Sequence, residues 1–295
     1  MVRSNRPSDA SRALPKPDLQ AYPRPSVAVD VAVLTVVPRR AMGSDAGDSS
    51  VDQANPRDRA STARGVQADA DLALVVLLLR RAASPSQGDW GLPGSFVRER
   101  ERLDDAVLRT LSEKCGIEGL EPRQLHVFDD PKRDDRGWVI SVAHTDVVLV
   151  DALLDARSTR DDLALAPVLA GPHTDDAPPA AMLAEPPGVS EAEPVVLDLP
   201  DGQRTLPFDH AEIVALAVGD LRDRYRTAPD PAGLAGESFT LLELRRVHEA
   251  VLGEPLQKDT FRRQMLGAIT EVEGDGPRVG TVGRPARLYR RLATG

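Results

Sequence analysis

Two long apolar runs constrain the fold of this chain more than any other feature of its sequence. Val27–Val37 reads VAVDVAVLTVV, and Leu72–Leu79 reads LALVVLLL. Runs of β-branched and aliphatic residues with so little polar alternation are typical of strands that are buried on both faces. We therefore expect a sheet covered by helices, an α+β fold of the α/β/α-sandwich kind.

The rest of the N-terminal two thirds alternates ordered and polar segments. A helix is predicted over Leu103–Cys115, and Gly116 ends it because glycine adopts the left-handed conformation that closes helices. Two further strands are predicted at Gln124–Asp129 and Trp138–Val150. Segments rich in proline or small polar residues are expected to be a disordered arm, a long surface insertion and a poorly ordered stretch, with a short strand near Val195–Leu197. These segments are an arm over 1–25, an insertion over 39–70 and an acidic proline-rich stretch over 151–194.

The last third predicts three helices and then a hairpin. Apolar residues recur at helical spacing in Asp209–Tyr225, Thr240–Leu252 and Asp259–Ala268, and the second of these begins with a T-x-x-E capping box. Ile269–Leu292 has the pattern of two strands around a turn. Helix, short turn, helix and hairpin is the order of a winged helix. The predicted domains are therefore residues 26–205 and residues 206–295.

Charge is distributed unevenly along the chain. The net charge is −9, yet residues 256–295 carry 8 Lys/Arg against 4 Asp/Glu, a net of +4. Residues 145–200 carry 11 Asp/Glu against 2 Arg, a net of −9. An acidic body with a basic end indicates a polyanionic partner for that end alone. The single cysteine excludes a disulfide framework, and the absence of a signal peptide or membrane-length apolar run favours a cytoplasmic protein.

The segment from Gly94 to Ile117 resembles the signature of Nudix hydrolases. That signature places a glycine first, then a glutamate, and ends in the order Arg-Glu-aliphatic-x-Glu-Glu-x-Gly-aliphatic. Ser95 takes the place of the first glycine, and Thr110 and Lys114 stand where the family has glutamates. The remaining signature positions match, namely Glu101, Arg109, Leu111, Glu113, Gly116 and Ile117.

The resemblance implies a Nudix fold, and the two departures bear on its chemistry. Nudix carboxylates hold Mg²⁺ against a diphosphate, because hard cations prefer oxygen ligands. A hydroxyl and an ammonium at two of these positions predict that efficient hydrolysis is lost, that no cofactor is required, and that the Lys114 ammonium could take the place of the cation. Any remaining Mg²⁺ site would be weak and would use Glu101 and Glu113, with Asp105 as a further candidate. The plain alternative is a surface helix whose charges form an i,i+4 ladder, through Glu101, Asp105, Arg109 and Glu113.

The segment FDDPKRDDRGWVISVAH resembles the strand-turn-strand of ADP-ribose-type Nudix proteins. The resemblance makes Arg133 and Arg136 candidate ligand-binding residues, since a guanidinium can bind a diphosphate through two hydrogen bonds. Trp90 is a third candidate, which could stack on a nucleobase, whereas Trp138 is expected to pack in the core. A charged hairpin tip without a ligand is the alternative.

Residues 206–292 resemble the C-terminal winged helix of Nudix-related transcriptional regulators of NAD metabolism, the NrtR-type family. The matching segments are LPFDHAEIVALAVGDLR, FTLLELRRVHEAVLG, FRRQML and GRPARLYRRL. A winged helix inserts its second helix into the major groove, and basic side chains contact phosphates or bases. The predicted DNA-binding residues are Lys258, Thr260, Arg262 and Arg263 on the helix, and Arg278, Arg284, Arg287 and Arg290 on the hairpin.

Together these features favour a DNA-binding transcriptional regulator. By the resemblance it senses ADP-ribose or a related NAD-derived nucleotide, and effector binding changes the spacing of two winged helices in a homodimer on operator DNA. Two alternatives stay open. One is a Nudix hydrolase, an ADP-ribose pyrophosphatase with an accessory C-terminal domain. The other is a partner-binding protein that docks through its acidic proline-rich segment.

Overall fold

A computed structural model describes residues 22–39, 71–169, 193–272 and 286–292 of the chain. Several predictions lie outside these residues. They are most of the N-terminal arm, the insertion over 40–70, residues 170–192 of the acidic stretch, and the candidate DNA-binding residues Arg278 and Arg284.

The two apolar runs form neighbouring strands of one mixed eight-stranded sheet. β1 (Ser26–Pro38) pairs in parallel with β6 (Val139–Val147) and antiparallel with β2 (Leu72–Arg80). The order across the sheet is β5-β6-β1-β2-β7-β8, while β3 pairs with β2 and β4 pairs with β1. The remaining strands are β3 (Trp90–Gly91), β4 (Gly94–Phe96), β5 (Arg123–Phe128), β7 (Leu163–Leu169) and β8 (Val196–Leu197).

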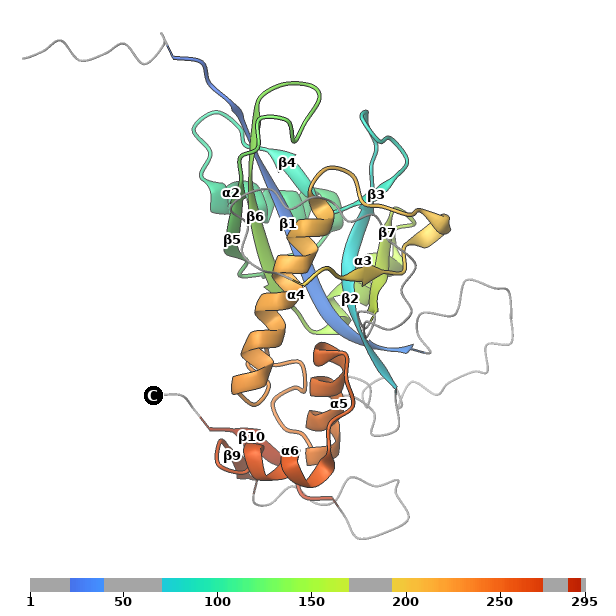
Figure 1. Ribbon diagram of the computed structural model, residues 1–295, viewed down its shortest axis with the longest axis vertical. Coiled ribbons are helices and arrows are strands. Elements are labelled where there is room, and N and C mark those ends of the chain that lie inside the picture. The colour runs from blue at the N-terminus through green and yellow to red at the C-terminus, as the bar shows by residue number, and fades with distance from the viewer. Residues whose placement is uncertain (1–21, 40–70, 170–192, 273–285, 293–295) are drawn as a thin grey trace, which may run out of the picture.

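Alternate residues of the central strands face two different helical layers, because side chains alternate along a strand. Val29, Val31 and Val33 of β1 pack with α2 (Leu103–Thr110) and α3 (Val150–Ser158). The intervening residues Ala32, Leu34 and Val36 of the same strand pack on the opposite side, against α4 (His210–Thr227) and α5 (Leu241–Leu252). Figure 1 shows α4 crossing the sheet on that side. The predicted α/β/α sandwich is confirmed.

The helix that carries the Nudix-like segment begins and ends as predicted. α2 continues directly into a five-residue π-helix, η3 (Leu111–Cys115), and Gly116 closes it with a φ of 69°. That φ lies in the left-handed region, which favours glycine. A π-helical turn at the end of an α-helix is uncommon, and where such turns occur they are often at functional sites.

The prediction that residues 151–169 lack order is wrong. α3 buries Leu153, and β7 pairs antiparallel with β2 from Leu163 to Pro167. The composition of the longer stretch was misleading, because Pro167 is the only proline between residues 151 and 169. The short strand predicted at Val195–Leu197 is confirmed as β8, and a 3₁₀ turn, η4 (Pro200–Gly202), follows it.

The C-terminal elements occur in the predicted order. Thr240 caps α5 through a capping box with Glu243, and Gly253 ends it with a φ of 76°. α6 (Lys258–Met265) follows, and β9 (Ile269–Glu271) pairs antiparallel with β10 (Tyr289–Arg291). These elements form the predicted winged helix. The described residues include no helix long and apolar enough to cross a membrane.

One hydrophobic core runs from the sheet into the winged helix. Its members come from strands of the sheet, chiefly β1 and β2, from α4, and from α5, α6, β9 and β10. α4 contributes to both ends of this cluster, and Figure 1 shows it extending from the sheet toward the winged helix. The helix α4 therefore connects the sheet domain to the winged helix and packs against both. The residues of α4 in this cluster are Ile213, Val214, Ala217, Val218, Leu221 and Tyr225.

A buried polar network connects the C-terminal end of α4 to the winged helix. The Tyr225 hydroxyl donates to Asp230, 2.6 Å away, and Arg291 of β10 also pairs with Asp230. The ring of His248 from α5 lies edge-on to Tyr225 at 4.9 Å and to Phe261 of α6 at 5.0 Å between centroids. This network ties α4, α5, α6 and the hairpin into one unit.

Candidate functional site

The charged residues of the Nudix-like segment are held mainly by one another. Glu101 precedes α2 and accepts two hydrogen bonds from Arg109, at 2.6 and 2.9 Å. It also accepts from the backbone N–H of Arg98 at 2.7 Å. The bond from Arg109, with that from Arg98, lowers the pKa of Glu101 to about 2. Glu101 is therefore a constraint on the loop before α2.

The other positions of the segment have few carboxylates to offer. The Thr110 hydroxyl is buried, donates to Ala106 O at 2.6 Å and lies 2.5 Å from Ser95 Oγ. The Lys114 ammonium donates to the carbonyl of Gly94 at 2.5 Å. Glu113 is half exposed and lies 3.3 Å from an Arg98 nitrogen.

This arrangement does not fit a divalent metal. Hard cations need several free carboxylate or carbonyl oxygens at one point. Here both Glu101 oxygens bind Arg109, the Gly94 carbonyl binds an ammonium, and Glu113 faces arginines. Among the described residues, no group of three or more His, Cys, Asp or Glu side chains could hold a metal ion.

The loop between β5 and β6 reaches across to the start of α4. Arg133 makes two hydrogen bonds to Asp209, at 2.6 and 2.7 Å, and lies 3.5 Å from Asp30 of β1. All three side chains are almost fully buried. Arg136 instead pairs with Asp134 at 2.6 Å and is half exposed. Arg133 is thus a link between the loop and α4, while Arg136 remains near the surface.

Asp30 is the centre of this link. Burial alone would raise the pKa of its carboxyl, but interactions with His210, Ser141 and Arg133 outweigh it and hold the pKa below its usual value. The backbone N–H of Leu92 donates to Nδ1 of His210 at 2.9 Å, so Nε2 carries the proton that faces Asp30. Asp30 therefore connects β1, the β5–β6 loop and the first turn of α4.

The two tryptophans lie differently from the predictions. Trp90 is buried, its indole N–H donates to Asp201 at 3.1 Å, and the Arg80 guanidinium lies 4.6 Å from its ring centroid. That placement does not favour stacking on a ligand. Trp138, expected in the core, is 47% exposed. The expectation failed because the predicted strand began one residue too early: β6 begins at Val139, and Trp138 lies just before it.

The predicted DNA-binding residues of α6 share one exposed face. Lys258, Thr260, Arg262 and Arg263 are exposed, while Phe261 and Met265 are buried on the other side. The three basic side chains form no ion pair with any residue that the structure describes. Such a face can meet phosphates without first breaking an internal contact.

The described part of the hairpin adds two basic residues. Arg290 is exposed, and Arg287 is exposed and pairs with Glu271 of β9 at 2.8 Å. Arg291, which the sequence did not single out, points inward to Asp230 instead. Alternation along the strand separates these neighbouring arginines.

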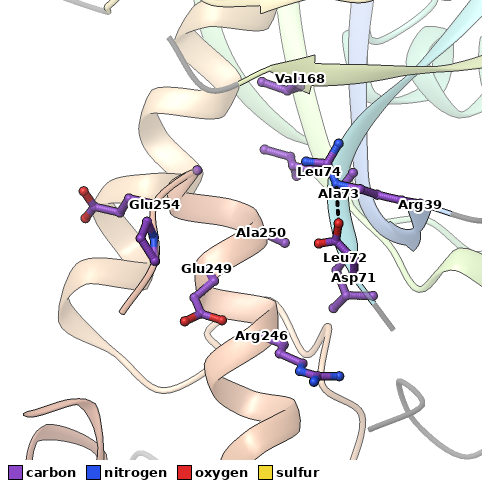
Figure 2. Close-up of a pocket in the computed structure, with 12 residues that line it drawn as sticks. Arg39, Asp71, Leu72, Ala73, Leu74, Val168, Arg246, Glu249, Ala250 and Glu254 are labelled. Carbon is purple, nitrogen blue, oxygen red and sulfur yellow. Dashed lines mark ion pairs between the residues drawn. The ribbon is translucent and has the colours of Figure 1, made fainter. Parts of the chain in front are cut away.

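A cavity of about 420 Å³ lies between β2 and α5, away from the Nudix-like segment. Figure 2 shows Leu72 and Leu74 on one side and Ala250 on α5 on the other. Arg39 and Asp71 pair with each other at its rim, 3.2 Å apart. The cavity lies at the interface between the sheet and the winged helix, and none of the predicted site residues lines it.

Sequence reasoning missed four residues near the Nudix-like segment. Asp30 carried a signal, because it is the one charge in an apolar strand. Asp209 and Phe208 lie in the connection to α4 and become site residues only through tertiary contacts. Arg81 follows β2 directly, and nothing in its local sequence distinguishes it from Arg80.

The fold and these sites define a class of protein, in which a sheet domain with a Nudix-like segment is joined by a packed helix to a winged helix. Two family descriptions match this division: "NUDIX domain" over residues 59–180, and "NrtR DNA-binding winged helix domain" over residues 231–291. The chain belongs to the family of Nudix-related proteins that carry an NrtR-type winged helix domain.

Two curated relatives differ in how much of this chain they match. The chain is 29% identical over 219 residues to the "ADPR responsive transcriptional repressor NtrR" of Acinetobacter baylyi, covering 74% of this chain and 75% of that protein. It is 34% identical over 87 residues to an ADP-ribose pyrophosphatase of Methanocaldococcus jannaschii, covering 30% of this chain and 49% of that enzyme.

Solved structures support the same domain arrangement. Shewanella oneidensis NrtR, crystallised with a 27mer DNA, is 26% identical with a TM-score of 0.56, covering 90% of this chain and 93% of that chain. A MutT/nudix family protein from Enterococcus faecalis shares the fold at 22% identity and a TM-score of 0.60, covering 94% of this chain and 90% of that chain.

Proposed function

We propose that this chain is a transcriptional repressor that binds operator DNA through its winged helix and responds to ADP-ribose or a related NAD-derived nucleotide. The observation that carries the proposal is the exposed basic face of α6, which forms no ion pair with the described residues, on a domain that matches an NrtR DNA-binding winged helix. The Acinetobacter relative, named as an ADPR responsive repressor, supports the effector and the sign of control. A repressor acts where the genome lies, so we place it in the cytoplasm.

We further propose that the Nudix-type domain senses its nucleotide without efficient hydrolysis. The support is the local geometry, in which Glu101 is bound by Arg109 and the Lys114 ammonium binds the Gly94 carbonyl. A carboxylate already paired with a guanidinium is a poor ligand for Mg²⁺, because the cation must displace that partner. The residues Glu101, Arg109 and Glu113 then shape the site instead of performing catalysis.

Signal transfer is proposed to pass through α4. Arg133 lies in the loop between β5 and β6, where a ligand-binding role was predicted, and it binds Asp209 at the start of α4. Near the other end of α4, Tyr225 binds Asp230 in the winged helix. A nucleotide that moves the loop would bias the placement of α4, and with it the spacing of two winged helices in a homodimer. Each ligand then alters the affinity for the other.

The test is binding to a labelled duplex from the region upstream of the gene, at two salt concentrations, with and without ADP-ribose. We expect sequence-preferring binding that weakens with salt, because released counterions dominate the affinity, and that ADP-ribose reduces. Arg226→Ala tests whether losing any exposed positive charge weakens binding, because Arg226 is an exposed arginine on α4 that pairs with Asp223. We expect this variant to bind the duplex as the wild-type chain does. The absence of any sequence preference at both salt concentrations would refute the proposal.

A second candidate function is favoured by the relative that is named as an ADP-ribose pyrophosphatase. In that case Glu101 and Glu113 would have to hold a metal. The discriminating measurement is AMP release from ADP-ribose with Mg²⁺ or Mn²⁺. The repressor proposal expects turnover far below about 1 per second, and turnover at or above that ordinary enzymatic rate would reverse the ranking.

A further inference from the structure

Two cations, one in the Nudix-like segment and one outside it, lie half-buried without a carboxylate partner among the described residues. Arg81 directly follows β2, and its Nε and Nη2 both donate to the carbonyl of Pro85 at 3.1 Å. Lys114 lies in η3 and donates to the carbonyl of Gly94. Neither forms an ion pair with any residue in the described ranges.

Contacts place both cations around Asp30. Lys114 binds the carbonyl of Gly94, which lies opposite Asp30 between β4 and β1, and Arg81 lies over Phe208, whose ring is next to that of His210 beside Asp30. Burial lowers the pKa of Lys114, and the charge of Arg81 lowers it further. Burial likewise lowers the pKa of Arg81, with Arg136 adding to the effect. The carboxylates nearby are Asp30, whose oxygens already face Ser141, His210 and Arg133, Asp134, which pairs with Arg136, and Asp89. None of them forms an ion pair with Arg81 or Lys114 in the described ranges. The positive charge of the pair is therefore left without a dedicated counter-ion.

Both cations are held in place by contacts that do not neutralise them. The Arg81 guanidinium lies 4.9 Å from the ring centroid of Phe208, and Arg136 lies 5.9 Å from the same ring. Carbonyl and ring contacts fix direction while leaving the formal charge uncompensated. A desolvated cation without a partner is costly for the folded state, and such groups are frequent where a charged ligand binds.

We infer that Arg81 and Lys114 bind the diphosphate of a nucleotide directly, in a site that needs no divalent metal, with Arg136 as the third cation at its edge. The identity of the nucleotide rests on the proposed function, whereas the anion site rests on these contacts. A planar guanidinium suits two phosphate oxygens at once, and an ammonium suits a single one. Lys114 stands at a Nudix glutamate position, so its ammonium supplies there the positive charge that a carboxylate-bound metal would otherwise bring.

The experiment is calorimetric titration of the full chain with ADP-ribose and, separately, with inorganic pyrophosphate. Each titration is run in EDTA and in Mg²⁺. The variants are Arg81→Gln, Lys114→Gln and Lys114→Glu, with Arg226→Gln as the matched control on an exposed arginine of α4. We expect wild-type affinity in EDTA to equal that in Mg²⁺ within about twofold.

Each neutral variant is expected to bind about tenfold or more weakly, in keeping with the loss of a charge-assisted hydrogen bond. Lys114→Glu is expected to lose more than Lys114→Gln, and Arg226→Gln to bind as wild type does. The melting temperatures of the ligand-free Arg81 and Lys114 variants are expected to be unchanged or higher, because each removes a poorly compensated charge. This separates a lost ligand contact from a damaged fold.

The outcomes distinguish the anion site from the proposed effector. If pyrophosphate binds in EDTA but ADP-ribose does not, the effector identity fails and the anion site stands. Binding that occurs only with Mg²⁺ would overturn the inference, as would wild-type affinity in the Arg81 and Lys114 variants. If neither anion binds the wild-type chain, both the site and the effector are wrong.

Discussion

The Nudix-like segment and the exposed face of α6 are both rich in charge, but they use it in opposite ways. Around the segment, carboxylates and guanidinium groups bind one another, as Glu101 does with Arg109 and Asp209 with Arg133. On α6, Lys258, Arg262 and Arg263 face solvent without an ion pair among the described residues. Internally paired charges fix the fold, whereas unpaired ones mark a surface for a partner.

The largest effect on stability is expected when the buried ion pair at the start of α4 is removed. Asp209→Ala leaves the Arg133 guanidinium, whose side chain is 6% exposed, without its two hydrogen bonds. We expect the free energy of unfolding to fall by about 3–5 kcal/mol, measured by urea denaturation. Asp223→Ala, which removes an exposed pair on the same helix, should change it by less than about 1 kcal/mol. Equal effects of the two substitutions would contradict this account of α4.

The opposite pattern is expected on α6. Replacing Arg262 and Arg263 together by alanine should weaken duplex binding about 100-fold, since each base or phosphate contact contributes about 1–3 kcal/mol. Stability should change little, because both side chains are exposed and form no ion pair with the described residues. Fluorescence anisotropy with a labelled duplex and thermal melting measure the two quantities. An unaltered affinity would remove α6 from the interface.

The buried network of the winged helix predicts a pH dependence. Burial lowers the pKa of His248 to about 4, whereas an unfolded histidine titrates near 6.5. Below pH 6.5 the unfolded chain binds the proton first, so His248 destabilises the fold progressively as the pH falls toward 4. Its share is about 2 kcal/mol between pH 7 and pH 5. Urea denaturation of His248→Gln at both pH values should show a smaller loss, and an equal loss would refute the assignment.

The smallest effect is expected on the hairpin. Arg287→Ala should cause a minor loss of duplex affinity that is the same for all sequences, and should reduce the slope of log affinity against log salt by about 1. The matched control is Glu271→Ala, which releases Arg287 from its ion pair and should leave affinity unchanged or higher. A change in sequence preference in Arg287→Ala would show that the residue reads bases.

The sequence predicted elements well where the pattern was local. The strands β1 and β2, the capping box at Thr240, and the glycine ends at Gly116 and Gly253 follow from spacing and backbone chemistry that neighbouring residues determine. The failure at residues 151–169 came from averaging composition over a longer stretch, in which the prolines lie mostly beyond β7.

The site could be predicted only in part, because its partners come from distant segments. Arg133 was expected to bind a ligand, but its nearest partner is Asp209, 76 residues away. Arg81 and Lys114 come near each other only because η3 packs on the sheet that contains β2. Sequence spacing carries no information on such contacts, whereas the departure at Lys114 was visible from the signature alone.

The central claim is that one chain couples a nucleotide site to a DNA-binding face. Its most direct test measures duplex affinity with and without saturating ADP-ribose, and ADP-ribose affinity with and without saturating duplex. Linkage requires both affinities to change by the same factor, and we expect weaker binding of each ligand in the presence of the other. Affinities that do not depend on the second ligand would contradict the claim.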